Sequence, residues 1–505
     1  MKKKVLFVQP FALDFYNDQK ILSNLILVWF IYLENYLKSK IENICSDLLY
    51  LPLETNKIKI TSFEEREKFY KQMNELISNI KFDIDENTYI CLSGTTSYYY
   101  LSIKLIAEYF RELYPSAIII FGGVHASTRP HDFDYINSPI DYVIIGEGEI
   151  ILYEIIKNNY KKQKSPKIII GNPIQDLNEL PPLDLSLLDK YIKSFNSLSI
   201  CLSRGCPFNC TFCLERNVAK NTETQNLWRA YSPKRAIKET KTMIDFGLNF
   251  GIKEYGFVDP TFGAKKIWFE KFLELWDFEE KSSATWIETR VDLLNERMIE
   301  TLKKKNFFLW YGVESCSKKM LNIMNKQLDP KNFLSKLENN FKKHIELDYL
   351  CMSNVIFNHP GETKETCLES FEGLKKIVNQ DKNNNLYFSI RYYHHFPGTI
   401  IYNNSNYYNK KYGTEIYFPE WWKNENLLKY GPYLVKASYF LDLNEIINLY
   451  TSFCKELNNI NIENLKENKP ENYKIKILGI LKQIKSIESL KQGLLDFVKE
   501  CKLEN

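Results

Sequence analysis

Three cysteines stand close together in this sequence, in the order CxxxCxxC. Cys206, Cys210 and Cys213 lie within the segment RGCPFNCTFC. A structural zinc ion or an electron-carrying iron–sulfur cluster is normally held by four protein ligands. Three closely spaced thiolates can instead hold a four-iron, four-sulfur cluster and leave one iron open for a substrate or cofactor. The spacing therefore predicts a metal centre that takes part in catalysis.

Composition is that of an ordinary globular protein with reduced cysteines. The 505 residues are 44% hydrophobic and 26% charged, which predicts two or three domains. A net charge of +4 predicts neither a nucleic-acid surface nor a membrane surface. The other eight cysteines are scattered and the total of 11 is odd. We therefore expect a cytoplasmic protein without a disulfide framework.

The N-terminal segment predicts a strand followed by a buried helix. The start MKKKVLFVQPF reaches Gln9 and Pro10 after only four apolar residues, so we interpret it as a first strand and not as a signal peptide. The most apolar stretch, residues 21–37, contains Ser23, Asn24 and Glu34. It falls short of the ~20 apolar residues that cross a bilayer, which favours a helix packed on a sheet.

The first 165 residues alternate between short β-branched runs and helical patterns. Such runs are typical of strands buried on both faces, and the segments between them are long enough for crossover helices. We predict an α/β domain with a doubly wound, Rossmann- or flavodoxin-like parallel sheet. Its expected strands are residues 5–8, 45–51, 89–92, 117–121 and 142–145.

Small and polar residues follow three of these expected strands. In doubly wound sheets, ligands bind beyond the carboxyl ends of the strands, and glycine lets the backbone approach a large ligand closely. Neither GxGxxG nor GxxxxGK is present, so the usual dinucleotide and triphosphate sites are not predicted. The candidate binding residues are Ser93, Thr95, Ser97, Gly122, Gly123, Val124, His125, Gly146, Glu147 and Gly148.

A second α/β unit follows a connection rich in proline and turn-forming residues. We expect domain 1 to cover residues 1–165, the linker 166–195, the second domain 196–400 and a mainly helical C-terminal region 401–505. Ser232-Pro233 predicts the start of a helix in the second unit, and Leu294, Met298 and Leu302 predict the buried face of another. The six expected strands are residues 198–201, 255–258, 284–289, 308–313, 349–357 and 386–393.

Over about residues 1–400 the chain resembles the class B, cobalamin-dependent radical S-adenosylmethionine (SAM) enzymes. The resemblance is carried by RGCPFNCTFC, by GGVHAS ahead of Arg129-Pro130, by DYVIIGEGE and by the polar groups that end the later strands. It implies a cobalamin-binding domain followed by a partial (β/α)6 radical SAM barrel. The DxHxxG motif of classical cobalamin proteins is absent, so His125 is not expected to ligate cobalt but to line the corrin face or its tail.

The resemblance also implies roles for individual residues. Cys206, Cys210 and Cys213 would hold a [4Fe-4S] cluster whose open iron binds SAM. Phe212 would lie against the adenine, and Asp259 would contact the SAM amino group. Arg290 would grip the SAM carboxylate, for which a guanidinium is suited because it can bind in a bidentate manner. Glu314 would accept the ribose hydroxyls, although for Arg290 and Glu314 a structural ion pair at the barrel mouth is the alternative.

The activity implied by the resemblance is methylation of an unactivated carbon in a small-molecule or peptide substrate. A 5'-deoxyadenosyl radical would remove hydrogen, methylcobalamin would donate the methyl group, and an external flavodoxin- or ferredoxin-type protein would supply electrons. Two alternatives stay open. One is cobalamin-using radical chemistry without methyl transfer, such as ring contraction, cyclisation or rearrangement. The other is a non-catalytic metal or redox protein in which Cys201 completes a zinc or cluster site.

Candidate substrate residues follow the last expected strand. Tyr392, His394 and His395 offer groups for a base or a hydrogen-bond donor, whereas Pro360-Gly361-Glu362 is interpreted as a loop turn. Residues 441–457 and 473–484 have amphipathic helical patterns. We expect the region after residue 400 to close the open side of the barrel and to shape the substrate pocket.

Overall fold

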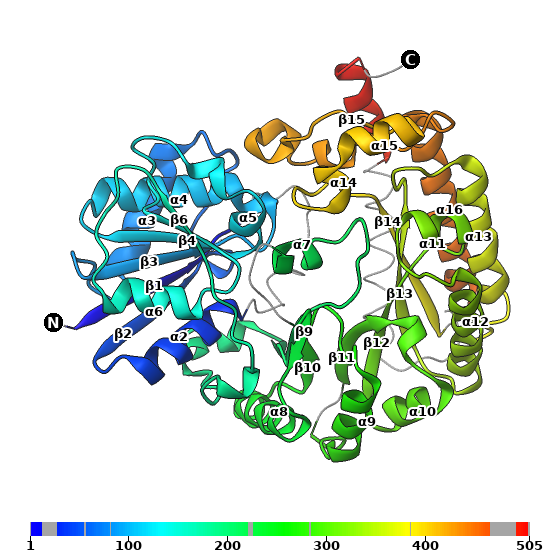
Figure 1. Cartoon of the computed structure of the whole chain (residues 1–505), viewed down its shortest axis with the longest axis horizontal. Coiled ribbons are helices and arrows are strands. Elements are labelled where there is room, and N and C mark those ends of the chain that lie inside the picture. The colour runs from blue at the N-terminus through cyan, green and yellow to red at the C-terminus, as the bar shows by residue number, and fades with distance from the viewer. Residues whose placement is uncertain are drawn as a thin grey trace.

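The computed structural model describes residues 2–12, 28–54, 57–80, 82–220, 226–281, 284–383, 385–464 and 491–502. It contains two α/β domains in sequence order, and the C-terminal segments lie across both (Figure 1). The expected strand at residues 5–8 is present, while residues 21–27 and the expected helix at 473–484 lie outside the described residues. No helix in the described ranges is both long and apolar enough to cross a lipid bilayer.

The first domain contains the predicted doubly wound sheet. All neighbouring strands pair in parallel, in the order β2-β1-β3-β4-β5-β6. Its strands are β1 (Lys3–Gln9), β2 (Ile44–Tyr50), β3 (Thr88–Ser93), β4 (Ile118–Gly122), β5 (Tyr142–Ile145) and β6 (Lys167–Ile170). Its helices are α2 (Trp29–Lys40), α3 (Arg66–Ser78), α4 (Tyr100–Leu113), α5 (Gly123–Thr128) and α6 (Glu149–Lys157). Strand β6 lies where the sequence predicted the start of the linker.

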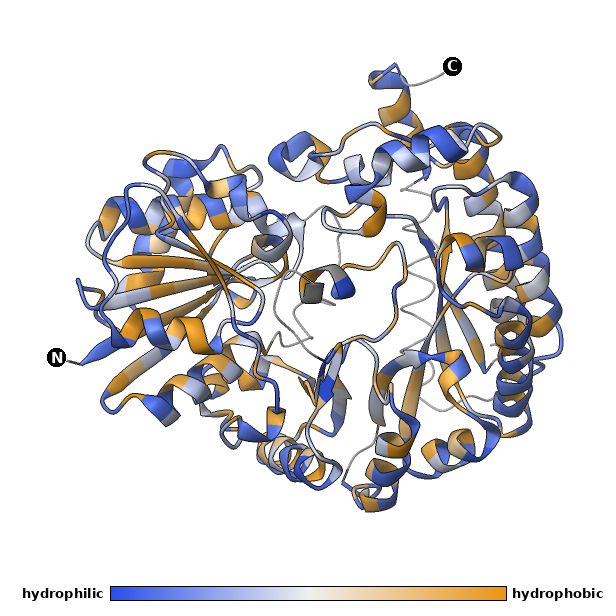
Figure 2. Cartoon of the chain, in the orientation of Figure 1, coloured by the Kyte–Doolittle hydropathy of each residue, from blue (hydrophilic) through white to orange (hydrophobic). Residues whose placement is uncertain are grey.

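Alternate side chains of each strand point to opposite faces of this sheet. Phe7 belongs to the core shared with α2 and α6, whereas Leu6 and Val8 belong to the core shared with α3 and α4. Strands buried on both faces carry continuous apolar runs, and these runs are orange in Figure 2. The core on the α2 side continues through the connection into the second domain, by way of Leu177 and Phe195. The two domains therefore share one apolar core.

The second domain is an open six-stranded parallel barrel, as predicted. The strand order is β14-β13-β12-β11-β10-β7, and no pairing joins the edge strands β7 and β14 in the described part of the chain. The strands are β7 (Ser197–Ile200), β10 (Glu254–Phe257), β11 (Ala284–Arg290), β12 (Phe307–Glu314), β13 (Cys351–Phe357) and β14 (Leu386–Tyr392). The hairpin β8 (Ser203–Gly205) and β9 (Trp228–Ala230) follows β7.

Helices cover the outer side of the barrel sheet (Figure 1). Asn295 caps α10 by accepting a hydrogen bond from the Met298 N–H, and Ser232 caps α8 in the same way, as the sequence predicted. The helices on this side are α8 (Pro233–Leu248), α9 (Lys266–Leu275), α10 (Glu296–Lys304), α11 (Lys318–Ile323), α12 (Pro330–Glu346) and α13 (Lys364–Val378). Helix α7 (Glu215–Lys220) lies instead between the first domain and the barrel, next to α5 and β8.

The C-terminal region is mainly helical, but its long helix does not close the open side of the barrel. Helix α16 (Leu443–Asn464) packs on the outside, against α13 and β14, where Phe453 stacks on Phe371 with 4.1 Å between ring centroids. The preceding segment contains α14 (Ile400–Asn403), α15 (Ser405–Tyr412), β15 (Glu415–Ile416) and β16 (Val435–Lys436). Its Trp421 and Trp422 are buried in the core of the first domain.

Candidate active site

The cysteine loop begins at the end of hairpin strand β8. Gly205 has a φ of +79°, and a Cβ there would lie 2.2 Å from the Leu227 carbonyl oxygen, so the hairpin requires glycine at this position. Burial, together with the nearby thiols of Cys210 and Cys206, raises the pKa of Cys213 to about 12. The three thiols therefore lie close enough to repel one another as thiolates, and a cationic metal centre would relieve that repulsion.

The arrangement fits a multi-iron cluster better than a single ion. Among the described residues, no group of three His, Cys, Asp or Glu side chains converges on a point that could hold one metal ion. The thiolates of an iron–sulfur cube bind separate irons, so they need not converge. Cys201 points elsewhere, because its thiol lies 3.5 Å from the Val258 carbonyl oxygen. This geometry does not support the zinc site completed by Cys201.

Three contacts brace the cysteine loop against the far side of the barrel. The Thr211 N–H donates to the Met324 carbonyl at 2.9 Å, and the Asn325 amide donates to the Asn209 carbonyl at 2.8 Å. The Thr211 hydroxyl lies 3.1 Å from His359 Nε2. The sequence analysis missed these partners because they come from two distant segments that carry no metal-ligand pattern.

Arg290 lies at the barrel mouth, and one of its nitrogens has no hydrogen-bond partner among the described residues. Its Nε and Nη2 donate to the two carboxylate oxygens of Asp292 at 2.9 and 3.0 Å, and its guanidinium lies 3.9 Å from the Phe208 ring centroid. Of the three Arg290 side-chain nitrogens, Nη1 is the one that is buried without a hydrogen-bond partner among the described residues. Asp292 occupies the Nε–Nη2 edge of the guanidinium, so a SAM carboxylate would have to approach the N–H groups that remain on Nη1 and Nη2. The grip of Arg290 on that carboxylate stays a prediction.

Glu314 and Lys326 form a buried ion pair at 3.0 Å beside Arg290. Glu314 has a φ of 68°, and the register of β12 against β13 shifts between Gly312 and Glu314. A Cβ at Gly312 would lie 2.7 Å from the Glu314 carboxylate and 2.8 Å from Lys326 Nζ, so glycine makes room for the pair. Lys326 is a site residue that the sequence analysis missed, because it follows a helix and no strand.

Asp259 and Phe212 occupy different surroundings. Asp259 is buried, which raises its pKa to about 7, and it accepts hydrogen bonds from the Leu202 N–H at 3.1 Å and from the Ser203 hydroxyl. Its oxygens thus hold the β7–β8 corner, and the predicted contact with a SAM amino group is not supported. Phe212 packs against a small apolar cluster that also includes Ile356 and Tyr393.

A cavity of about 450 Å³ lies between the two domains. Its walls come from the carboxyl ends of β3, β4 and β5 and, on the barrel side, from Cys201, Arg204 and Val258. The structure therefore brings most of the predicted strand-end residues to one place. Those that line the cavity are Ser93, Thr95, Gly122, Gly123, Val124, Gly146, Glu147 and Gly148.

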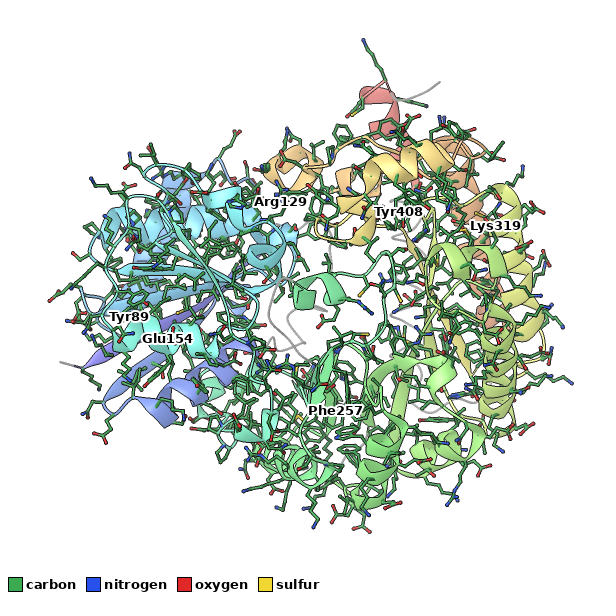
Figure 3. All side chains as sticks on the ribbon, viewed as in Figure 1. Tyr89, Arg129, Glu154, Phe257, Lys319 and Tyr408 are labelled. Atoms are coloured by element: carbon green, nitrogen blue, oxygen red, sulfur yellow. The ribbon has the colours of Figure 1, made fainter. Side chains whose placement is uncertain are left out.

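Ser97 and His125 do not line this cavity. His125 is fully buried, with Nδ1 2.9 Å from the Ser97 hydroxyl and Nε2 3.3 Å from Asp132, and burial lowers its pKa. Trp422 donates to the same Asp132 carboxylate at 2.7 Å, and Arg129 pairs with it as well. His125 is thus held inside the first domain by Ser97 and Asp132, and its contact with a corrin stays a prediction. Figure 3 places Arg129 on the side of this domain that faces the C-terminal segments, where it pairs with Glu420.

Two glutamates of the GEGE segment clamp the first domain onto the cysteine hairpin. Arg204 donates to Glu147 at 2.9 Å and to Glu149 at 2.6 Å, and Arg229 also pairs with Glu147. Burial alone would raise the pKa of Glu147, but Arg204 and Arg229 outweigh burial and hold it below its usual value. Glu147 thus lines the cavity with its charge already neutralised. Arg204 stands two residues before Cys206, so this clamp fixes the cavity relative to the cysteine loop.

The three predicted catalytic side chains do not share one site. Tyr392 lies on the outer face of β14, in the core beside Tyr450, so it does not face the inside of the barrel. His394 packs edge-on against Tyr433, and burial lowers its pKa to about 3. His395 is buried against Tyr402 at a separate pocket between α14, α15 and β15. The structure therefore does not bring these three residues together, and a role of His394 or His395 toward a substrate stays a prediction.

Comparisons with known proteins agree with this two-domain architecture. Residues 200–374 match the model of the radical SAM superfamily. An uncharacterised methyltransferase of Pyrococcus horikoshii is 26% identical over 59% of this chain and 65% of its own length, so the chain spans less than two thirds of that relative.

Two solved proteins share the fold. OxsB, a cobalamin-dependent SAM radical enzyme solved with aqua-cobalamin, has a TM-score of 0.65, 16% identity and coverage of 99% of this chain and 75% of its own. TsrM of Kitasatospora setae, a radical SAM methyltransferase solved with cobalamin and a [4Fe-4S] cluster, has a TM-score of 0.58, 14% identity and coverage of 82% and 77%. The chain therefore contains a radical SAM domain. It has the domain architecture of the class B, cobalamin-dependent radical SAM proteins.

We predict that Glu147→Gln destabilises the protein by about 3 kcal/mol, because it leaves Arg204 and the buried Arg229 without their shared counter-charge. Urea unfolding followed by circular dichroism measures this loss. The matched control is Glu112→Gln, which removes an exposed pair with Arg66 and should cost less than about 1 kcal/mol. Equal losses in the two variants would contradict the clamp.

We predict a pH effect from Glu362, which is fully buried and accepts a hydrogen bond from the Asn358 N–H at 2.5 Å. Burial raises its pKa to about 8. Between about pH 4.3 and pH 8 the folded protein keeps this proton and the unfolded chain does not, so the contribution to stability falls by up to about 1.4 kcal/mol per pH unit as pH rises. Glu362→Gln should flatten the profile of unfolding free energy against pH. Profiles that stay parallel would refute this.

Proposed function

We propose that this protein is a cobalamin-dependent radical SAM methyltransferase that methylates an unactivated carbon of a small-molecule or peptide substrate. The supporting observation is the cavity shared by the strand ends of the first domain and by Cys201, Arg204 and Val258, next to the cysteine loop. A ligand of the first domain would thus lie beside a cluster held by Cys206, Cys210 and Cys213. The names of the Pyrococcus relative and of TsrM agree with methyl transfer.

The residues present fit the implied cofactors. When bound, cluster and SAM supply a carbon-based radical, and cobalamin supplies the methyl group. Arg290 offers its free Nη1 to a SAM carboxylate, and the Glu314–Lys326 pair offers an acceptor for hydroxyls. The apolar cluster at Phe212 can enclose adenine. Because the charge of Glu147 is neutralised, the cavity wall is mostly apolar, as the face of a corrin requires.

The same proposal includes an external one-electron donor of the flavodoxin or ferredoxin type. The competing activity is radical chemistry that uses cobalamin without methyl transfer. Product analysis separates the two. Equal amounts of S-adenosylhomocysteine and 5'-deoxyadenosine support methyl transfer, and 5'-deoxyadenosine without S-adenosylhomocysteine supports the alternative.

For the cluster, we predict four irons per chain after anaerobic reconstitution and SAM cleavage that Cys210→Ala abolishes, because one iron then loses its only protein ligand. Iron analysis, electron paramagnetic resonance and chromatography of the nucleoside products measure this. Cys45→Ala is the control, since that thiol lies at the edge of the first domain, outside the site. One zinc per chain, lost in Cys201→Ala, would refute the proposal.

For cobalamin, we predict that Gly123→Ala weakens binding at least tenfold. Gly123 has a φ of +90°, and a Cβ there would lie 2.5 Å from the Ser93 hydroxyl and 2.9 Å from the Gly94 carbonyl oxygen, which pushes β3 and β4 apart at the cavity. Gly251→Ala is the matched control, because Gly251 has a φ of +78° with open space around it. Spectroscopic titration with hydroxocobalamin measures the affinities. Equal affinity of the two variants would contradict this assignment.

A further inference from the structure

The inner face of the barrel sheet carries polar side chains that have no partner in the described part of the chain. On β11, Ile287 and Thr289 are buried on the outer side, so the side chain of Glu288 points inward. On β14, Ile390 and Tyr392 belong to the core on the α16 side, so Arg391 points inward as well. Neither the Glu288 carboxylate nor the Arg391 guanidinium forms a hydrogen bond or ion pair with a described residue.

Two further inward-facing groups lie on the strands between them. Trp310 of β12 pairs with Glu288 in the register, and its indole N–H is buried without a partner. Asn354 of β13 has no hydrogen bond from its side chain to a described residue. Of these groups only the Trp310 indole N–H is fully buried, and buried polar groups in folded proteins normally have partners. Together with the exposed charges of Glu288 and Arg391, which face the same side of the sheet, it indicates a wall that is available to a ligand.

Glu288 is exposed and faces the inside of the barrel. Its side chain is accessible to solvent, yet surrounding protein raises its pKa, the Glu314 carboxylate raises it further and Arg391 lowers it. The charges of Glu288 and Arg391 therefore interact across the inside of the barrel. Their strands are separated by three strand steps of about 4.8 Å, or about 14 Å along the wall, which the curvature shortens across the opening.

Aromatic rings form the apolar part of the same wall. Trp286 points inward two residues before Glu288 and packs on the backbone of Gly256, where a Cβ would lie 2.0 Å from the indole. Phe308 and Trp310 alternate inward on β12. The wall thus combines one anionic group, one cationic group and flat apolar surface.

We propose that this wall binds the substrate, and that the substrate is a small amphoteric molecule whose amine faces Glu288 and whose carboxylate faces Arg391, with an aromatic or similarly flat body against Trp286 and Trp310. This assignment rests on the proposed function only in calling the ligand the substrate of methylation. The charges, the unpartnered indole N–H and the rings are reasons for the chemical class that do not depend on the reaction.

Three probes test this class: L-phenylalanine, 2-phenylethylamine, which lacks the carboxylate, and 3-phenylpropionate, which lacks the amine. Equilibrium dialysis with the anaerobic, cobalamin-loaded holoprotein gives each dissociation constant. We expect L-phenylalanine to bind more tightly than either analogue. Glu288→Gln should weaken L-phenylalanine and 2-phenylethylamine at least tenfold and leave 3-phenylpropionate unchanged. Arg391→Gln should weaken L-phenylalanine and 3-phenylpropionate and leave 2-phenylethylamine unchanged.

Glu274→Gln and Arg297→Gln, on exposed positions of α9 and α10, are the charge-matched controls and should not alter any affinity. A purely structural role for Glu288 or Arg391 would change all three affinities together, and that result would overturn the proposal. So would no saturable binding of L-phenylalanine to the wild-type holoprotein. SAM cleavage and cobalamin binding are measured in the absence of the three probes. Loss of either activity would contradict the proposed function, whereas the dialysis results test the substrate class by themselves.

Discussion

The ion pairs between Glu147, Glu149, Arg204 and Arg229 are the constraint on which the arrangement of the two domains depends. Removing four charged groups from water is expensive, and apolar residues of similar size could hold two domains together as well. Charged pairs differ from apolar contacts because they require one register and one orientation. Arg204 contacts both glutamates and stands two residues before Cys206. A shift of the first domain by a few ångströms would break these bonds, so the cavity and the cysteine loop keep a fixed separation.

The barrel divides structural and chemical roles between the two faces of one sheet. Outward residues such as Ile287 and Tyr311 fill the core under the helices, whereas the inward face includes the charged side chains of the barrel. Where an inward charge is neutralised, the partner is close in sequence, as with Arg290 and Asp292 or Glu314 and Lys326. Glu288 and Arg391 lack such a neighbour. This difference separates groups that shape the barrel mouth from groups that remain available to a ligand.

Features that depend on neighbouring residues could be predicted from the sequence, and features that depend on contacts between distant segments could not. Both sheets could be predicted because parallel strands buried on two faces produce continuous apolar runs. Strand β6 was missed because Lys167–Ile170 is short and both its ends are exposed. Most cavity residues were predicted from strand ends alone. The occupied edge of Arg290 and the outward turn of Tyr392 were not predictable, because they depend on a short turn after β11 and on where α16 packs.

The segments that follow the barrel support different parts of the molecule. Trp421 and Trp422 pack into the first domain, and Trp422 shares Asp132 with His125 beneath the cavity. Helix α16, in contrast, stiffens the outer face of β14 through Tyr450, which donates to the Ile390 carbonyl at 3.1 Å. Arg391 is the next residue, so its inward direction is fixed by packing on the opposite face. The C-terminal region thus packs against the first domain and against the outer face of β14. It supports both ligand walls from behind and contributes neither Glu288 nor Arg391.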